Sequence, residues 1–114
     1  MDERLETALA FSNYRVTIDN RKKAIKRRYE TMSVVYYNDG VFVADPQTIS
    51  FIGTLSVDSG GATVLDEKDR PIDIPDLLAF KQTLLEAYHT AMNEYADEMK
   101  KLAKARDVKK AMDW

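Results

Sequence analysis

The chain has 114 residues, a formal net charge of −2, 45% hydrophobic and 32% charged residues, and no cysteine. This composition argues against intrinsic disorder, and the lack of cysteine excludes disulfide bonds, thiolate zinc sites and thiol catalysis. No apolar run reaches the length of a membrane span, and the acidic start MDERLE lacks the basic and apolar regions of a secretory signal. We therefore expect a single domain over residues 1–114, located in the cytoplasm and without a membrane partner.

The charges are segregated along the chain. Residues 21–28 contain six basic and no acidic side chains (+6), and residues 38–76 contain eight acidic and two basic ones (−6). Residues 100–114 contain six basic and two acidic ones (+4). Such blocks can neutralise one another within a fold or between subunits, so they do not by themselves identify a polyanionic ligand.

A long amphipathic helix is predicted over residues 3–32, which contain no Gly or Pro. Its main apolar side chains fall within a sector of about 60°; they are Phe11, Tyr14, Ile18, Ile25, Tyr29 and Met32. Leu5, Leu9 and Val16 lie on nearly the opposite side. Because one partner helix cannot cover both faces, we expect Leu5, Leu9 and Val16 to serve self-association.

A β-containing head is predicted over residues 33–75. Residues 33–44 form two apolar runs around Asn38-Asp39-Gly40, which indicates a hairpin with a three-residue turn and Gly40 at positive φ. Both faces of this hairpin are apolar, so its side chains are either covered on each side or available for association. The candidates for association are Val35, Tyr37 and Phe42.

The remainder of the head contains one ambiguous segment and a second hairpin. Asp45 and Pro46 favour a short helix over residues 46–55, whereas the alternation of apolar and polar residues over 46–57 is typical of a strand. We favour the helix. Residues 62–74 read as a hairpin, in which Pro71 fits an edge or a strand start.

A second long helix is predicted over residues 76–105, with Asp76 as its N-cap. Its apolar residues alternate by three and four and extend back to Leu78, which indicates a heptad seam; they are Leu85, Tyr88, Met92, Tyr95, Met99 and Leu102. The pattern ends there. Residues 106–114 are expected to form a short amphipathic tail whose Val108, Met112 and Trp114 are candidates for docking on a partner protein.

The predicted fold class is α+β. Two long antiparallel amphipathic helices form a coiled-coil-like hairpin, joined by a small head of two β-hairpins and a short helix. Each helix of about thirty residues is about 45 Å long. This arrangement resembles the topology of prefoldin subunits, in which β-hairpins connect two coiled-coil helices.

Three segments carry a second resemblance: NDGVFVADPQTISFI, VLDEKDRPIDIPDLLAF and AYHTAMNEYADEMKKLAKARDVKKAM. They look like parts of small proteins encoded by large contractile-tailed bacteriophages, including those that infect cyanobacteria. The resemblance covers most of the chain but contains no motif diagnostic of chemistry. It implies a phage origin, a location in the host cytoplasm or the virion, and a particle-building or accessory role.

Basic side chains offer a possible contact with nucleic acid. On the first helix only Lys23, Lys26 and Arg27 cluster on the face opposite the seam. Non-specific duplex binding draws on about six to ten phosphate contacts, so this helix alone is too small a footprint. An oligomer, or a joint surface with the second basic segment, would suffice; the residues there are Lys100, Lys101 and Lys104.

Chemistry at a catalytic or metal site has little support in the sequence. Glu86 and His89 have the Glu-x-x-His spacing of di-iron helical bundles, but the chain has a single histidine. No nucleophile and base occur in a recognisable local context. We therefore expect no cofactor, no metal and no enzymatic activity. The expected role is that of an oligomeric structural, scaffold or assembly-chaperone protein; the alternatives are a nucleic-acid-binding accessory protein and an adaptor or inhibitor docking on a host protein.

Overall fold

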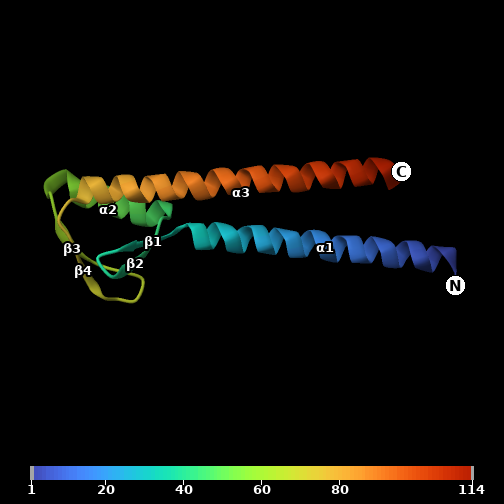
Figure 1. Cartoon of the computed structure of the whole chain (residues 1–114), viewed down its shortest axis with the longest axis horizontal. Helices are drawn as coiled ribbons and strands as arrows, with labels where there is room; N and C mark the ends of the chain where they lie inside the picture. The colour runs from blue at the N-terminus through green and yellow to red at the C-terminus, as the bar shows by residue number, and fades with distance from the viewer. Residues whose placement is uncertain (1, 114) are drawn as a thin grey trace. The chain divides into compact units, whose positions relative to one another are not determined.

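The computed structural model describes residues 2–113, and the side chains of residues 2–105. Seven elements follow one another along the chain (Figure 1). They are α1 (Glu3–Met32), β1 (Val34–Tyr37), β2 (Gly40–Val43), α2 (Pro46–Asp58), β3 (Ala62–Leu65), β4 (Pro71–Ile74) and α3 (Leu77–Asp113). The predicted α+β class, with two long helices, two hairpins and a short helix, is confirmed.

The residues fall into two compact units. Unit 1 contains α1 up to Arg28 and α3 from Glu94 onward, and unit 2 contains residues 29–93. In unit 1 the two helices run antiparallel, because Arg28 near the end of α1 pairs with Glu94 of α3, while Ile18 and Leu102 farther along are both buried. This is the predicted pairing of the helices through their seams.

Most of the predicted α1 seam is covered. Ile18 is buried, and Tyr14, Ile25, Tyr29 and Met32 are partly buried. Phe11 is the exception, since its side chain is 60% exposed.

The first hairpin turns more tightly than predicted. Tyr37 pairs with Gly40, and the two residues between them adopt positive φ, 45° at Asn38 and 65° at Asp39. This is the geometry of a two-residue type I′ turn, which Asn and Asp tolerate. The prediction that Gly40 takes positive φ is wrong. A Cβ at Gly40 would instead lie 2.6 Å from Cγ1 of Ile72, so close packing against β4 explains the glycine.

Residues 46–58 are helical, which resolves the ambiguous segment in favour of the helix. The Asp45 carboxylate caps α2 by accepting the Thr48 N–H at 2.7 Å. Ile52 is fully buried, whereas Phe51 and Val57 are 53% and 80% exposed. A strand would have placed Phe51 and Val57 on its inward face.

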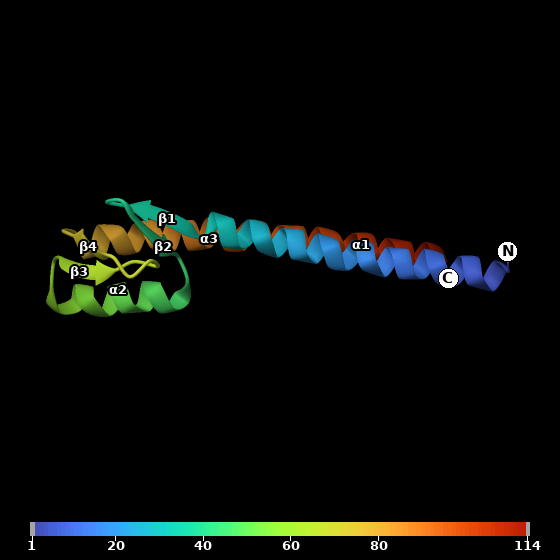
Figure 2. The ribbon, with the colours of Figure 1, turned by 90° about the horizontal axis from the view of Figure 1, so that it is seen from below.

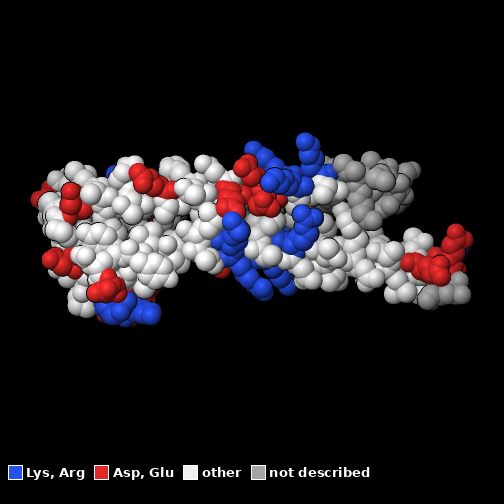
Figure 3. Space-filling model, in the orientation of Figure 1, with Lys and Arg blue, Asp and Glu red and all other residues white. Residues whose placement is uncertain are grey.

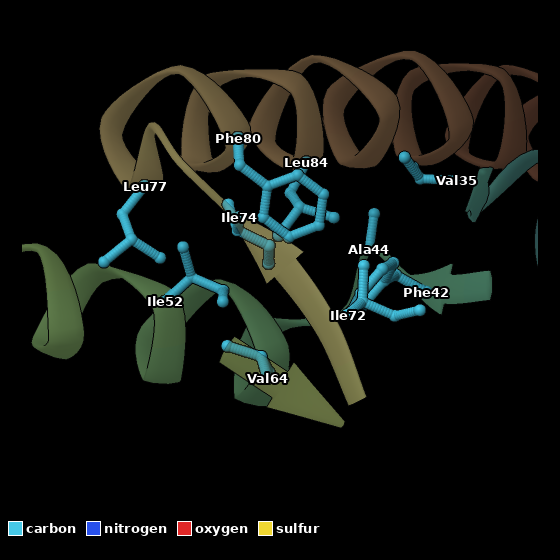
Figure 4. Packing of buried hydrophobic residues seen from close by; sticks show 10 residues of the cluster. All are labelled: Val35, Phe42, Ala44, Ile52, Val64, Ile72, Ile74, Leu77, Phe80 and Leu84. Atoms are coloured by element: carbon cyan, nitrogen blue, oxygen red, sulfur yellow. The ribbon is translucent and has the colours of Figure 1, made fainter. Parts of the chain in front are cut away.

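The core of unit 2 lies between the hairpins, α2 and the start of α3 (Figure 4). Its buried residues are Val35, Phe42, Ala44, Ile52, Val64, Ile72, Ile74, Leu77, Phe80 and Leu84. Phe80 is the centre of an aromatic group, with its ring centroid 4.8 Å from that of Tyr37 and 4.9 Å from that of Phe42. Figure 1 and Figure 2 both show α2 beside β3.

Asp76 caps α3 as predicted, accepting the Ala79 N–H at 3.0 Å. The predicted seam needs a correction in unit 2, where the buried residues of α3 are Leu77, Phe80, Leu84 and Ala91. Leu78, predicted to extend the seam, is 66% exposed. The helix also continues to Asp113, through residues expected to form a separate tail.

Candidate association surface

The outer face of α1 in unit 1 carries three exposed aliphatic side chains. Leu5 is 51% exposed, Leu9 is 47% exposed and Val16 is 56% exposed. At 100° per residue these positions fall within about 40° of one another, and roughly opposite the Ile18 seam. The helix thus buries one apolar face within unit 1 and leaves a second apolar stripe at the surface.

Charged residues continue this stripe at both ends. Asp2 precedes Leu5 on the same face, and its Oδ1 accepts the Arg4 N–H at 3.1 Å as the N-cap of α1. Lys23 and Arg27 follow Val16 on that face. Figure 3 shows red carboxylates at the N-terminal end of α1 and blue cations farther along unit 1. We call the face formed by Asp2, Leu5, Leu9, Val16, Lys23 and Arg27 the outer face of α1.

Two of the three hairpin residues proposed for association are buried. Val35 and Phe42 are 9% and 3% exposed and belong to the core of unit 2, so the structure removes them from the association candidates. Tyr37 is partly buried and packs its ring against Phe80. The hairpin exposes Tyr36 instead, at 78%.

The two basic segments meet in unit 1. Because Arg28 pairs with Glu94 in an antiparallel arrangement, Lys100 and Lys101 lie level with Lys22 and Arg21. Residues 21–28 supply six cations and α3 supplies Lys100, Lys101 and Lys104, so this stretch carries nine cations. Lys23, Lys26 and all three α3 lysines are exposed.

Acidic partners of these cations come from α3. Glu94 pairs with Arg28, and Glu98 accepts from Lys101 at 3.3 Å. The sequence had suggested the acidic residues 38–76 as the neutralising block, but these two pairs are made within unit 1. Exposed pairs of this kind contribute about 0–1 kcal/mol each.

The carboxyl of Asp66, at the start of the β3–β4 loop, has a strongly lowered pKa. Burial of this carboxyl raises its pKa. Hydrogen bonds from the backbone N–H groups of Val41, Arg70 and Lys68, and from the Arg70 guanidinium, lower the pKa by a larger amount. The pKa therefore lies well below its ordinary value of 3.8.

The hydrogen bonds of Asp66 show what this carboxylate does. Its Oδ1 accepts from Lys68 and Arg70 N–H at 3.0 and 2.9 Å, and its Oδ2 accepts from Val41 N–H at 2.9 Å. The Arg70 guanidinium adds bonds of 3.1 and 2.9 Å to Oδ2. Both carboxylate oxygens accept hydrogen bonds from protein donors, so Asp66 has a structural role and stabilises the β3–β4 loop.

The Glu-x-x-His pair of Glu86 and His89 lies on the surface of α3. Glu86 and His89 are both exposed, and Glu86 accepts a hydrogen bond from Gln82 at 3.4 Å. Within the part of the chain described, no group of three or more potential ligands is arranged to hold a metal ion. Among the same residues, none of the helices combines the length and apolar character needed to cross a bilayer.

The docking candidates Val108, Met112 and Trp114 lie outside the residues whose side chains are described. Comparison of the chain with protein-family models, curated protein sequences and solved structures finds no match. The candidate site therefore rests on the geometry of unit 1 alone.

Proposed function

We propose that this chain is a non-enzymatic, self-associating protein that acts as a structural, scaffold or assembly-chaperone component of a bacteriophage particle. The observation that carries the self-association is the exposed stripe of Leu5, Leu9 and Val16, opposite an apolar face that unit 1 already uses. Apolar stripes left exposed on a helix that has already buried its other apolar face are typical of contacts with another molecule. The phage context is supported by the three segments quoted above.

Light scattering of the wild-type chain at micromolar concentrations tests this proposal. Self-association predicts a mass above the 13.0 kDa of one chain, rising with protein concentration. A mass that stays at that of the single chain throughout would contradict the proposed function.

A second candidate is an accessory protein that binds nucleic acid through unit 1. The two basic stretches carry nine cations, and non-specific duplex binding draws on about six to ten phosphate contacts. The six cations of α1 point in several directions, so one duplex contacts only part of this set. Arg28 and Lys101 already have carboxylate partners, and this weakens the candidate.

Filter binding of duplex DNA at low salt distinguishes the two candidates. Nucleic-acid binding predicts an affinity that falls steeply as salt rises, and a smaller salt slope after Lys23→Gln and Lys104→Gln. Undetectable affinity at low salt, or affinity insensitive to salt, rules out this second candidate.

A further inference from the structure

We infer that the outer face of α1 pairs with the same face of a second copy of the chain, antiparallel, about a two-fold axis near Ser12. This inference rests on the proposed self-association and adds its partner, its orientation and its register. The pattern of charge along the outer face carries it.

The outer face reads acidic, then apolar, then basic. Asp2 lies at its start, Leu5, Leu9 and Val16 form its middle, and Lys23 and Arg27 lie at its end. All six side chains are exposed in the single chain. When two copies of this face lie antiparallel, the acidic end of each copy meets the basic end of the other.

An antiparallel pair centred between Ser12 and Asn13 brings residues i and 25 − i to the same level. Leu9 then faces Val16 of the second copy, and Asp2 faces Lys23 of the second copy. Leu5 lies level with Asn20, one turn from the aliphatic stem of Lys23. Each apolar residue is covered, and each end of the stripe is closed by opposite charges.

A parallel pair in register would bring like charges together. It would place Asp2 beside Asp2, and Lys23 and Arg27 beside their own copies, at both ends of a short apolar contact. Like charges across an interface oppose association and select against that orientation. Both orientations are isologous two-fold contacts, the commonest kind in soluble dimers, so the charge pattern is what distinguishes them.

Disulfide trapping tests the orientation cleanly, because the chain has no native cysteine. At about 1.5 Å per residue, the two copies of residue 12 lie about 2 Å apart along the helix axis, and the two copies of residue 23 lie about 30 Å apart. Ser12→Cys should therefore oxidise to a covalent dimer, and Lys23→Cys should not. Proximity in the dimer should make the first reaction about tenfold faster or more.

A mixed sample supplies the matched control. Asp2→Cys and Lys23→Cys should each stay monomeric on oxidation when alone, and give a covalent dimer when combined. Rapid self-linking of Lys23→Cys would show a parallel pair and overturn the inference. Failure of Ser12→Cys to link, in samples whose scattering shows association, would place the contact elsewhere and also overturn it. A single-chain mass in scattering would contradict the proposed function itself.

Discussion

The carboxylate of Asp66 accepts the backbone N–H of Val41 at 2.9 Å, across 25 residues of sequence. The Val41 carbonyl in turn accepts the Glu67 N–H at 2.9 Å. Both outward-facing backbone groups of Val41 in β2 are thus paired with the β3–β4 loop. Two hairpins, each a separate two-stranded sheet, are joined here by the Asp66 side chain and one backbone hydrogen bond, without a shared strand ladder. Asn38 adds a second link by donating to the Asp73 carbonyl at 2.9 Å.

Asp66→Asn should loosen the joint between the hairpins. An amide can accept at one atom only, and its NH₂ group would face donors from Val41 or Arg70. We expect faster hydrogen exchange at the Val41 and Glu67 amides and a lower thermal midpoint. The control is Asp73→Asn, because the Asp73 side chain on β4 is exposed. It should change neither the exchange rates of the two amides nor the thermal midpoint. Unchanged exchange in Asp66→Asn would show that the carboxylate does not hold this joint.

The same carboxylate predicts a pH dependence with a definite sign. Because the folded-state pKa of Asp66 is lowered, its contribution to the free energy of unfolding is complete above the unfolded-state pKa, 3.8. That contribution is lost progressively as pH falls below this value toward the lower folded-state pKa. Urea midpoints of wild type and Asp66→Asn should therefore converge as pH falls below about 4. A constant difference between them at all pH values would contradict this assignment.

Phe80→Ala should destabilise unit 2 strongly. Phe80 is 1% exposed and contacts the rings of Tyr37 and Phe42, and truncating such a residue costs about 3–5 kcal/mol. Leu78→Ala, two positions away and 66% exposed, should change the free energy of unfolding by about 0.5 kcal/mol or less. Urea unfolding measures both. The reverse order of effects would mean that the buried face of α3 is assigned incorrectly.

Charge reversal should report on the proposed α1 pairing. Asp2→Lys and Lys23→Asp each replace an opposite-charge contact by a like-charge one, twice per dimer, and should weaken the dimer about two- to tenfold. The combined variant restores opposite charges and should recover most of the affinity. Sedimentation equilibrium measures the dissociation constants, and circular dichroism checks that helicity is kept. Strictly additive weakening in the combined variant would argue against direct contact between these residues.

Local signals in the sequence predicted most of the elements of this fold. The caps Asp45 and Asp76 are adjacent to the helices they start, and Asn38-Asp39 marks the first hairpin within four residues of chain. Such features depend on backbone sterics and short-range hydrogen bonds, so they can be recognised without knowledge of the tertiary structure. The spare stripe of Leu5, Leu9 and Val16 was likewise visible, because helical periodicity alone places it opposite the seam.

Features that depend on distant parts of the chain were missed. The heptad reading chose Leu85 and Leu78, whereas packing against the hairpins buries Leu84 and Phe80. The apolar pattern of Val35 and Phe42 cannot by itself distinguish an association surface from a core, because the residues that cover them come from distant elements, among them Phe80 of α3. The role of Asp66 could not be foreseen, since it depends on Val41 approaching from another hairpin. The signal that was available is the charge-bearing turn DEKDR, in which Asp66 and Arg70 stand four residues apart.

Association of the chain through the outer face of α1 is tested most directly by one measurement on three chains. Sedimentation equilibrium is run on wild type, on Leu9→Asp with Val16→Asp, and on Phe51→Asp with Val57→Asp, which adds the same charges to exposed positions of α2. We predict that wild type and the α2 variant associate to the same extent, while the α1 variant sediments as a single chain of about 13 kDa with its helicity intact. Association of the α1 variant at wild-type strength, or a wild type that never exceeds the mass of one chain, would contradict the account.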